Sequence, residues 1–139
     1  DELGIQTEIM IKLSSSLKCF GRVPREVVLM NLEEADFTVL LRPATQRYAK
    51  AGFPTKVVES LATATPVIVN LTSDLNYYLK DMENSIIVKD HTPEEFYKAL
   101  KKAIKLKPNQ RENMRLKARK TAENYFHYNK YVELVKNKL

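Results

Sequence analysis

The segment formed by residues 47–70 constrains the fold more than any other part of the chain, because it specifies a loop, a helix, a turn and a strand in succession. A turn at residues 52–54 leads into the helix, and Pro54 suits the first helical position because its φ angle is already near the helical value. Apolar side chains then recur at helical spacing, at Val57, Val58, Leu61 and Ala62. The segment therefore predicts an amphipathic helix packed on a core.

The end of the same segment predicts a strand. Thr65 precedes Pro66, and a residue before proline avoids the helical region, so the helix ends there. Residues 67–69 are all apolar, which is typical of a parallel strand that is buried on both faces. At its other end, the first turn of the helix offers backbone N–H groups and the positive end of the helix dipole, which favour a phosphate.

Strands and helices alternate along the rest of the chain. Residues 37–41 form the strongest predicted strand because they are β-branched, aromatic or aliphatic, and shorter strands are predicted at residues 17–20 and 86–88. Helices are predicted at residues 5–13, 24–35, 92–106, 109–126 and 128–139, with a short one ending at Leu79 and a loop over residues 42–53. This alternation indicates parallel β/α units in an α/β domain, with a sheet of about four strands.

The composition fits a single folded domain. The 139 residues are 44% hydrophobic, which excludes a disordered chain. No apolar run has the length of a membrane span, and no secretory signal pattern opens the sequence. The one cysteine, Cys19, excludes an internal disulfide and fits a reducing cytoplasm, and its apolar neighbours predict a buried thiol.

The net charge of +6 is unevenly distributed. Residues 1–88 carry nine Lys/Arg and eleven Asp/Glu, whereas residues 89–139 carry fourteen Lys/Arg and six Asp/Glu. The basic surplus therefore lies in the last third, mainly in the helices predicted within residues 107–139. This distribution fits either an anionic neighbour or a solvated helix face.

Four motifs occur in a fixed order: residues 20–24 (FGRVP), 34–37 (EADF), 52–62 (GFPTKVVESLA) and 65–69 (TPVIV). In this order and spacing they resemble the C-terminal domain of GT-B type glycosyltransferases, in particular the group 1 (family 4) retaining enzymes. The resemblance extends from about Leu17 to Tyr131. It implies a Rossmann-like three-layer αβα domain with a mostly parallel sheet.

In that family this domain binds the nucleotide-diphosphate sugar whose sugar is transferred to an acceptor. The resemblance implies a hexosyltransferase of polysaccharide or glycolipid biosynthesis, with the nucleotide sugar as substrate and with no cofactor or metal. Glu59 matches the glutamate that binds the ribose hydroxyls, and a carboxylate suits that role because it accepts two hydrogen bonds from a diol. Two backbone segments also match: the nucleobase turn at Gly21, Arg22 and Val23, and the sugar and diphosphate loop at Gly52, Phe53, Pro54 and Thr55.

Release of a nucleotide diphosphate needs charge compensation rather than a strong nucleophile. Lys50 and Lys56 flank the matched loop and are the candidates for this role, with Arg42 and Arg47 behind them. A solvated loop charge is the alternative for each, and Lys56 is favoured by its first-turn position. Glu59 also has an alternative, as an exposed residue paired with Lys56 at i, i+3 spacing. No residue is assigned a catalytic role.

The sequence departs from the family pattern in three respects. Ala51 stands where the first glutamate of a pair usually contacts the donor sugar. Ala64 and Ser85 stand where glycine is usual, which costs about 1–2 kcal/mol each if the backbone there has a positive φ, unless the turn is shifted. Two strands that open the family's domain have no counterpart before Leu17, so we expect a fragment of a two-domain protein that is inactive alone.

Partners follow from these features. We expect the N-terminal domain of the parent protein to supply the acceptor contacts, and an exposed sheet edge to favour a homodimer. The basic helices favour an anionic membrane surface, hence a cytoplasmic, membrane-associated protein, whereas nucleic acid is disfavoured because no groove-binding motif accompanies the charge. A non-catalytic nucleotide-binding or scaffold domain of the same fold is the alternative function, and Ala51 favours it.

Overall fold

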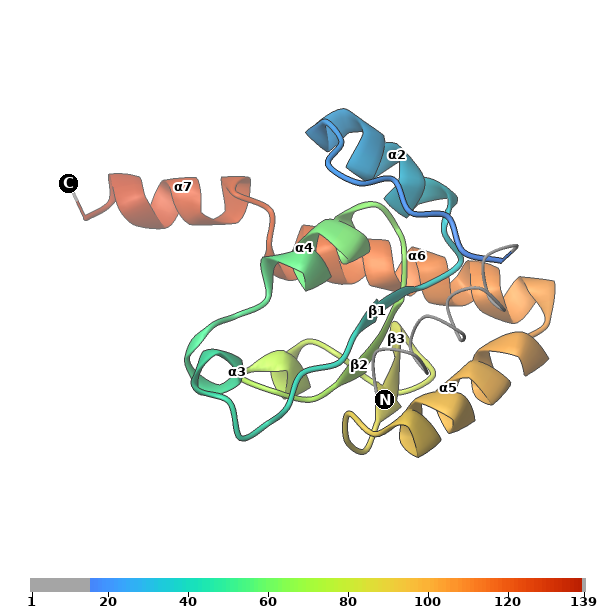
Figure 1. Ribbon diagram of the computed structural model, residues 1–139. Helices are drawn as coiled ribbons and strands as arrows, with labels where there is room; N and C mark the ends of the chain where they lie inside the picture. Colours follow the sequence, from blue (N-terminus) through green and yellow to red (C-terminus); the bar gives the residue numbers. More distant parts are fainter. Residues whose placement is uncertain (1–15, 139) are drawn as a thin grey trace.

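The computed structural model describes residues 16–138, which form a small sheet flanked by helices (Figure 1). In chain order the elements are α2 (Arg25–Glu34), β1 (Thr38–Leu40), α3 (Arg47–Ala51), α4 (Thr55–Ala62), β2 (Val67–Asn70), the 3₁₀ turn η1 (Leu75–Tyr77), β3 (Ser85–Val88), α5 (Pro93–Lys105), α6 (Pro108–Tyr125) and α7 (Asn129–Lys136). This alternation confirms the predicted α/β class. The helix predicted at residues 5–13 lies outside the described residues.

The sheet contains three parallel strands in the order β1-β2-β3. β2 is buried along its whole length, as its apolar run predicts, and pairs with β1 from Thr38↔Val67 to Leu40↔Val69. Within the described residues β1 has a strand on one side only, and Val39 at its centre is 50% exposed. β1 is therefore an open edge of the sheet.

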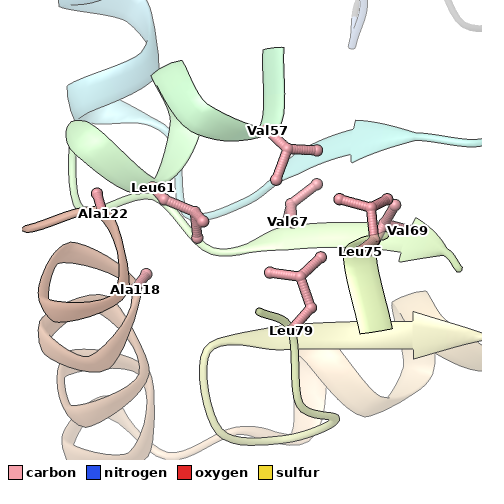
Figure 2. Close-up of a cluster of buried hydrophobic side chains, with 8 residues drawn as sticks. All are labelled: Val57, Leu61, Val67, Val69, Leu75, Leu79, Ala118 and Ala122. Atoms are coloured by element: carbon pink, nitrogen blue, oxygen red, sulfur yellow. The ribbon is translucent and has the colours of Figure 1, made fainter. Parts of the chain in front are cut away.

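Helices cover both faces of the sheet, which confirms the three-layer arrangement. Successive strand residues point to opposite faces. Val67 and Val69 therefore pack with α4 and the C-terminal half of α6 (Figure 2). Ile68 points the other way and packs in a second cluster with Ile86, Val88, Ala99, Ala103, Leu106 and Met114. Since α6 contributes to both clusters, it joins the two layers at one end of the sheet.

Several local predictions are wrong. Residues 17–20 form no strand and are exposed, because this segment has no partner strand in the described part of the chain. The Cys19 thiol is consequently exposed rather than buried. The predicted loop over residues 42–53 contains the short helix α3, and the predicted helix ending at Leu79 is reduced to the single turn η1.

The helix boundaries mostly follow the capping signals. Thr92 caps α5, where its hydroxyl accepts a hydrogen bond from the Glu95 N–H at 3.4 Å. Pro54 occupies the position directly before α4 instead of the first turn of the helix. α6 begins at Pro108 rather than after a cap at Asn109. These differences of one or two residues leave the order of the elements as predicted.

The turns before β2 and β3 test the two positions where the family pattern has glycine. Ala64 has a φ of 57°. The Thr65 N–H donates to the Ser60 carbonyl at 2.8 Å and the Ala64 N–H donates to the Leu61 carbonyl at 3.1 Å, which together form a Schellman motif. Ser85 instead lies in β3, and the positive φ before that strand falls on Met82. The backbone is therefore strained at Ala64, whereas the positive φ before β3 is shifted from Ser85 to Met82.

Candidate functional site

A groove of about 360 Å³ lies between α2, β1 and α4. Its walls are mostly apolar, and two charged residues of α4, Lys56 and Glu59, line it. The remaining lining residues are Val28, Leu32, Thr38, Val39, Leu40, Val57 and Val67. A mainly apolar groove with a few convergent polar groups is the usual form of a small-molecule site.

Glu59 faces α2 from the middle of α4. Its side chain is 32% exposed, and its Oε1 lies 3.1 Å from Nη1 of Arg25, the first residue of α2. A pair this exposed contributes about 1 kcal/mol or less to stability. The ion pair instead connects α4 to the start of α2, which directly follows the predicted nucleobase turn.

That turn lies directly before the start of α2. Gly21 has a φ of +64°, a conformation that glycine adopts without steric cost, and Arg22 is exposed. Val23 lines a smaller cavity of about 220 Å³ together with Val28 and Leu32, which also line the groove beside Glu59. Val23 of the predicted nucleobase turn and Glu59 thus line two cavities that share Val28 and Leu32 of α2.

The loop before α4 is held in place by the side chains of Phe53 and Pro54. Phe53 packs against Tyr78 and Phe126, with each pair of ring centroids 5.6 Å apart, and Pro54 is buried. Thr55 and Lys56 are exposed in the first turn of α4, where helical bonding leaves N–H groups free. Phe53 is therefore suited to fix the loop, while Thr55 and Lys56 face solvent.

The two lysines that flank the loop differ in position. Lys56 lines the groove three residues before Glu59, on the same helix. Lys50 is exposed in the last turn of α3 and is not among the residues that line the groove. Ala51, which replaces the usual glutamate, is exposed at the end of α3. Of the charged residues predicted to bind the donor, Lys56 and Glu59 are thus the two that line the same groove.

Arg42 makes its side-chain hydrogen bonds with the segment that leads to α4. Its guanidinium donates from Nη2 to the Tyr48 carbonyl at 2.7 Å and from Nη1 to the Gly52 carbonyl at 3.3 Å. Arg47 is exposed, and Arg25, which sequence reasoning missed, is the cation that contacts Glu59. Arg25 gave no signal in the sequence because its contact with Glu59 joins residues that are 34 positions apart in the chain.

Ionisable groups outside the groove form no metal site in the described part of the chain. No group of three His, Cys, Asp or Glu side chains within residues 16–138 is placed to hold a metal ion. Hydrogen bonds from Thr92 lower the pKa of Asp90, and the Glu95 carboxylate raises the pKa of Lys98. Both groups lie at the start of α5 and do not line the groove of Lys56 and Glu59.

Comparison with known proteins identifies the family. The model of the family described as "Glycosyl transferases group 1" matches residues 11–121. This chain belongs to the group 1 glycosyl transferases. The match confirms the resemblance inferred from the four ordered motifs and includes the nucleobase turn, the loop before α4 and Glu59. No curated protein sequence matches the chain.

Among solved structures, the fold resembles that of sucrose-phosphate synthase from Thermosynechococcus elongatus. The TM-score is 0.78 at 15% sequence identity, over 96% of this chain and 32% of that one. The likeness confirms the GT-B, Rossmann-like fold. The chain spans about a third of the length of that structure. Of the helices in the described residues, none is both long and apolar enough to cross a membrane.

Proposed function

We propose that this chain is the donor-binding half of a glycosyltransferase, and that it binds a nucleotide-diphosphate sugar in the groove between α2, β1 and α4. The observation that carries the proposal is the placement of Lys56 and Glu59 on one helix at the side of an apolar groove. One groove then offers a cation for the diphosphate, a carboxylate for the ribose diol and an apolar surface for the base. This combination matches the chemistry of a nucleotide diphosphate.

Each part of the donor has a natural position in this arrangement. The diphosphate lies at the first turn of α4, where the Thr55 and Lys56 N–H groups, the helix dipole and the Lys56 ammonium compensate its charge. The ribose hydroxyls donate to Glu59. The base lies toward Val28 and the turn that contains Val23, whose side chain borders the same α2 residues.

The Arg25 contact sets a condition on ribose binding. The Glu59 carboxylate oxygen Oε1 already faces Arg25 at 3.1 Å. A carboxylate has about four lone-pair positions on its two oxygens, so it accepts hydrogen bonds from a diol and a guanidinium together. Arg25 can therefore remain in place and hold Glu59 toward the groove while the ribose binds.

Charge compensation at the diphosphate is the step that this half contributes to sugar transfer. As the bond between the sugar and the diphosphate breaks, negative charge grows on the leaving phosphate, and groups already aimed at it stabilise the transition state. Lys56 and the first-turn amides supply this stabilisation without a metal or cofactor. Lys50, Gly52 and Pro54 complete the proposed donor-binding segment by shaping the turn that leads to them.

The acceptor and the rest of the active site are proposed to come from elsewhere in the parent protein. We propose a hexose-type donor and a polysaccharide or glycolipid acceptor, bound by an N-terminal domain, with this chain inactive alone. The open edge at β1 favours a homodimer of the isolated chain. The basic C-terminal third favours attachment of the cytoplasmic protein to an anionic membrane surface.

A second candidate function rests on Ala51. If the glutamate usual at this position is needed for transfer, the domain binds a nucleotide without catalysis and serves as a recognition or scaffold module. Ala51 has no group that can hydrogen-bond a sugar hydroxyl. Activity of the parent protein that is abolished by Glu59→Gln would exclude this second candidate.

Titration of the chain with UDP, GDP and ADP, followed through backbone amide shifts, tests the proposal. We expect shifts at residues 21–23 and 52–59 with one of the three nucleotides. Glu59→Gln and Lys56→Gln should each weaken binding about tenfold, since each removes a charge-assisted hydrogen bond. Their matched controls are Glu94→Gln and Lys105→Gln, at exposed α5 positions. No shift with any nucleotide, from a folded chain, would refute donor binding by this half alone.

A further inference from the structure

A pair of hydrogen bonds extends the sheet beyond the point where its backbone pairing stops. The last residue pair between β1 and β2 is Leu40↔Val69. Asn70, the last residue of β2, is only 3% exposed. Its Oδ1 accepts a hydrogen bond from the Arg42 N–H at 2.8 Å, and its Nδ2 donates to the Arg42 carbonyl at 2.7 Å. The buried amide of Asn70 thus satisfies both backbone groups of Arg42 in the way that a neighbouring strand would.

The side chain of Arg42 carries this constraint to the proposed donor loop. Nη2 donates to the Tyr48 carbonyl and Nη1 donates to the Gly52 carbonyl, while the guanidinium carbon lies 5.2 Å from the centroid of the Tyr48 ring. The Tyr48 carbonyl also accepts the Gly52 N–H at 3.1 Å. Gly52 precedes Phe53 and Pro54, which lead directly into the first turn of α4.

We propose that Asn70 and Arg42 are positioning residues for the donor site: they fix the loop at Gly52 and thereby the first turn of α4 against the diphosphate. The inference rests on the proposed function. It gives Arg42 a positioning role beside the charge compensation expected from the sequence, because two of its five guanidinium N–H groups donate to carbonyls of the loop. A planar fork that makes two such bonds is a role that lysine does not reproduce.

The inference has consequences for the free protein. Asn70→Ala removes both bonds to the Arg42 backbone without changing any charge. We expect the amide signals of Gly52, Thr55 and Lys56 to shift in the ligand-free spectrum of this variant. Asn76→Ala makes the same chemical change at an exposed position in η1 and should leave these signals in place. Unchanged signals in Asn70→Ala would overturn the inference, whether or not the wild-type chain binds a nucleotide.

The consequence for binding separates position from charge. For the nucleotide that binds the wild-type chain most tightly, we expect about a tenfold loss of diphosphate affinity in both Arg42→Lys and Asn70→Ala. The affinity for the corresponding nucleoside, which lacks phosphates, should be unchanged. A double variant should lose no more than the weaker-binding single variant, because both act through one connection. Full retention of affinity in Arg42→Lys would show that its charge alone matters and would overturn the inference.

Stability measurements keep these outcomes interpretable. Urea unfolding of each variant shows whether it is folded at the titration temperature, and Arg42→Lys provides the test if Asn70→Ala is too unstable. Equal losses for nucleoside and nucleotide would indicate a general disturbance of the fold and would also overturn the positioning role. If no nucleotide binds the wild-type chain, the proposed function fails, and the ligand-free amide shifts alone decide whether Asn70 and Arg42 hold the loop.

Discussion

The Schellman turn at the end of α4 allows a sharp test of how backbone conformation limits the stability of this chain. Ala64 occupies the position after the helix end with a φ of 57°, where glycine is usual. The left-handed conformation costs a residue with a Cβ atom about 1–2 kcal/mol. Ala64→Gly removes this cost in the folded state, but it also raises the entropy of the unfolded chain, which costs about 0.4–1 kcal/mol.

The difference between the two terms predicts that Ala64→Gly stabilises the protein by about 0.5–1 kcal/mol. The motif itself stays intact, because the bonds from Thr65 to Ser60 and from Ala64 to Leu61 involve only backbone groups. In thermal unfolding this gain corresponds to a rise of about 2–4 °C in the midpoint for a domain of this size. Urea unfolding should show a higher midpoint with an unchanged slope.

Ala62→Gly is the matched control. Ala62 is the last residue of α4, two residues before the turn, and its φ is not positive. The same substitution there gains no relief of strain and should destabilise the protein by about 1 kcal/mol. Opposite signs for the two variants support the argument. A destabilising Ala64→Gly, or equal effects at both positions, would refute the assignment of strain to Ala64.

Three further predictions concern the edge of the sheet, the basic C-terminal third and the start of α5. If β1 joins two copies, Val39→Lys should abolish the self-association seen in sedimentation velocity, whereas Leu116→Lys, at an exposed position on α6, should not. Equal association of the two variants would exclude the β1 edge as the interface. The chain should co-sediment with vesicles that contain phosphatidylserine but not with vesicles of pure phosphatidylcholine, and added salt should release it. Equal binding to both kinds of vesicle would contradict an electrostatic attachment. The pKa of Asp90 is lowered in the folded state, so its stabilising contribution is present above the unfolded pKa and is lost as the pH falls through the folded pKa. Asp90→Asn should therefore reduce the loss of stability below about pH 4. The same loss of stability in the variant and in the wild-type chain would contradict this.

The central part of the fold could be predicted because its signals are local. The apolar spacing in residues 57–62, the proline at residue 66 and the run at residues 67–69 each specify their own element, and the structure places α4 and β2 there. The strand predicted at residues 17–20 failed for the opposite reason. A strand needs a partner, and this segment has none within the described residues. Local sequence patterns do not reveal that condition.

The site was predictable to a similar extent. The resemblance located Glu59 and the turn at Gly21, and the first-turn position in the helix pointed to Lys56. The structure places Lys56 and Glu59 in one groove. It did not reveal the connection between Asn70 and Arg42, whose bonds join residues 28 positions apart in the chain. An asparagine at the end of a buried apolar strand is the signal that was available, because a buried amide requires hydrogen-bond partners.

The two helices that border the groove, α4 and α2, are held by different numbers of buried contacts, and this difference affects how a donor would bind. The α4 side is tied to the sheet at both ends of the helix: Asn70 and Arg42 hold the loop before it, and the buried Ser60 hydroxyl donates to the Thr65 carbonyl after it. On the other side no residue of α2 is buried, and Arg25 at its start reaches α4 through an exposed ion pair. The C-terminal end of α2 is held by hydrogen bonds, which the Thr65 hydroxyl donates to the Leu32 carbonyl and Arg115 donates to the Glu33 carbonyl. The helix α4, whose first turn we propose binds the diphosphate, is therefore held at both ends, whereas α2, which borders the proposed base site, is held mainly at its C-terminal end. Binding to groups that are already held costs less ordering entropy, so the diphosphate is the part of the donor that we expect to dominate affinity.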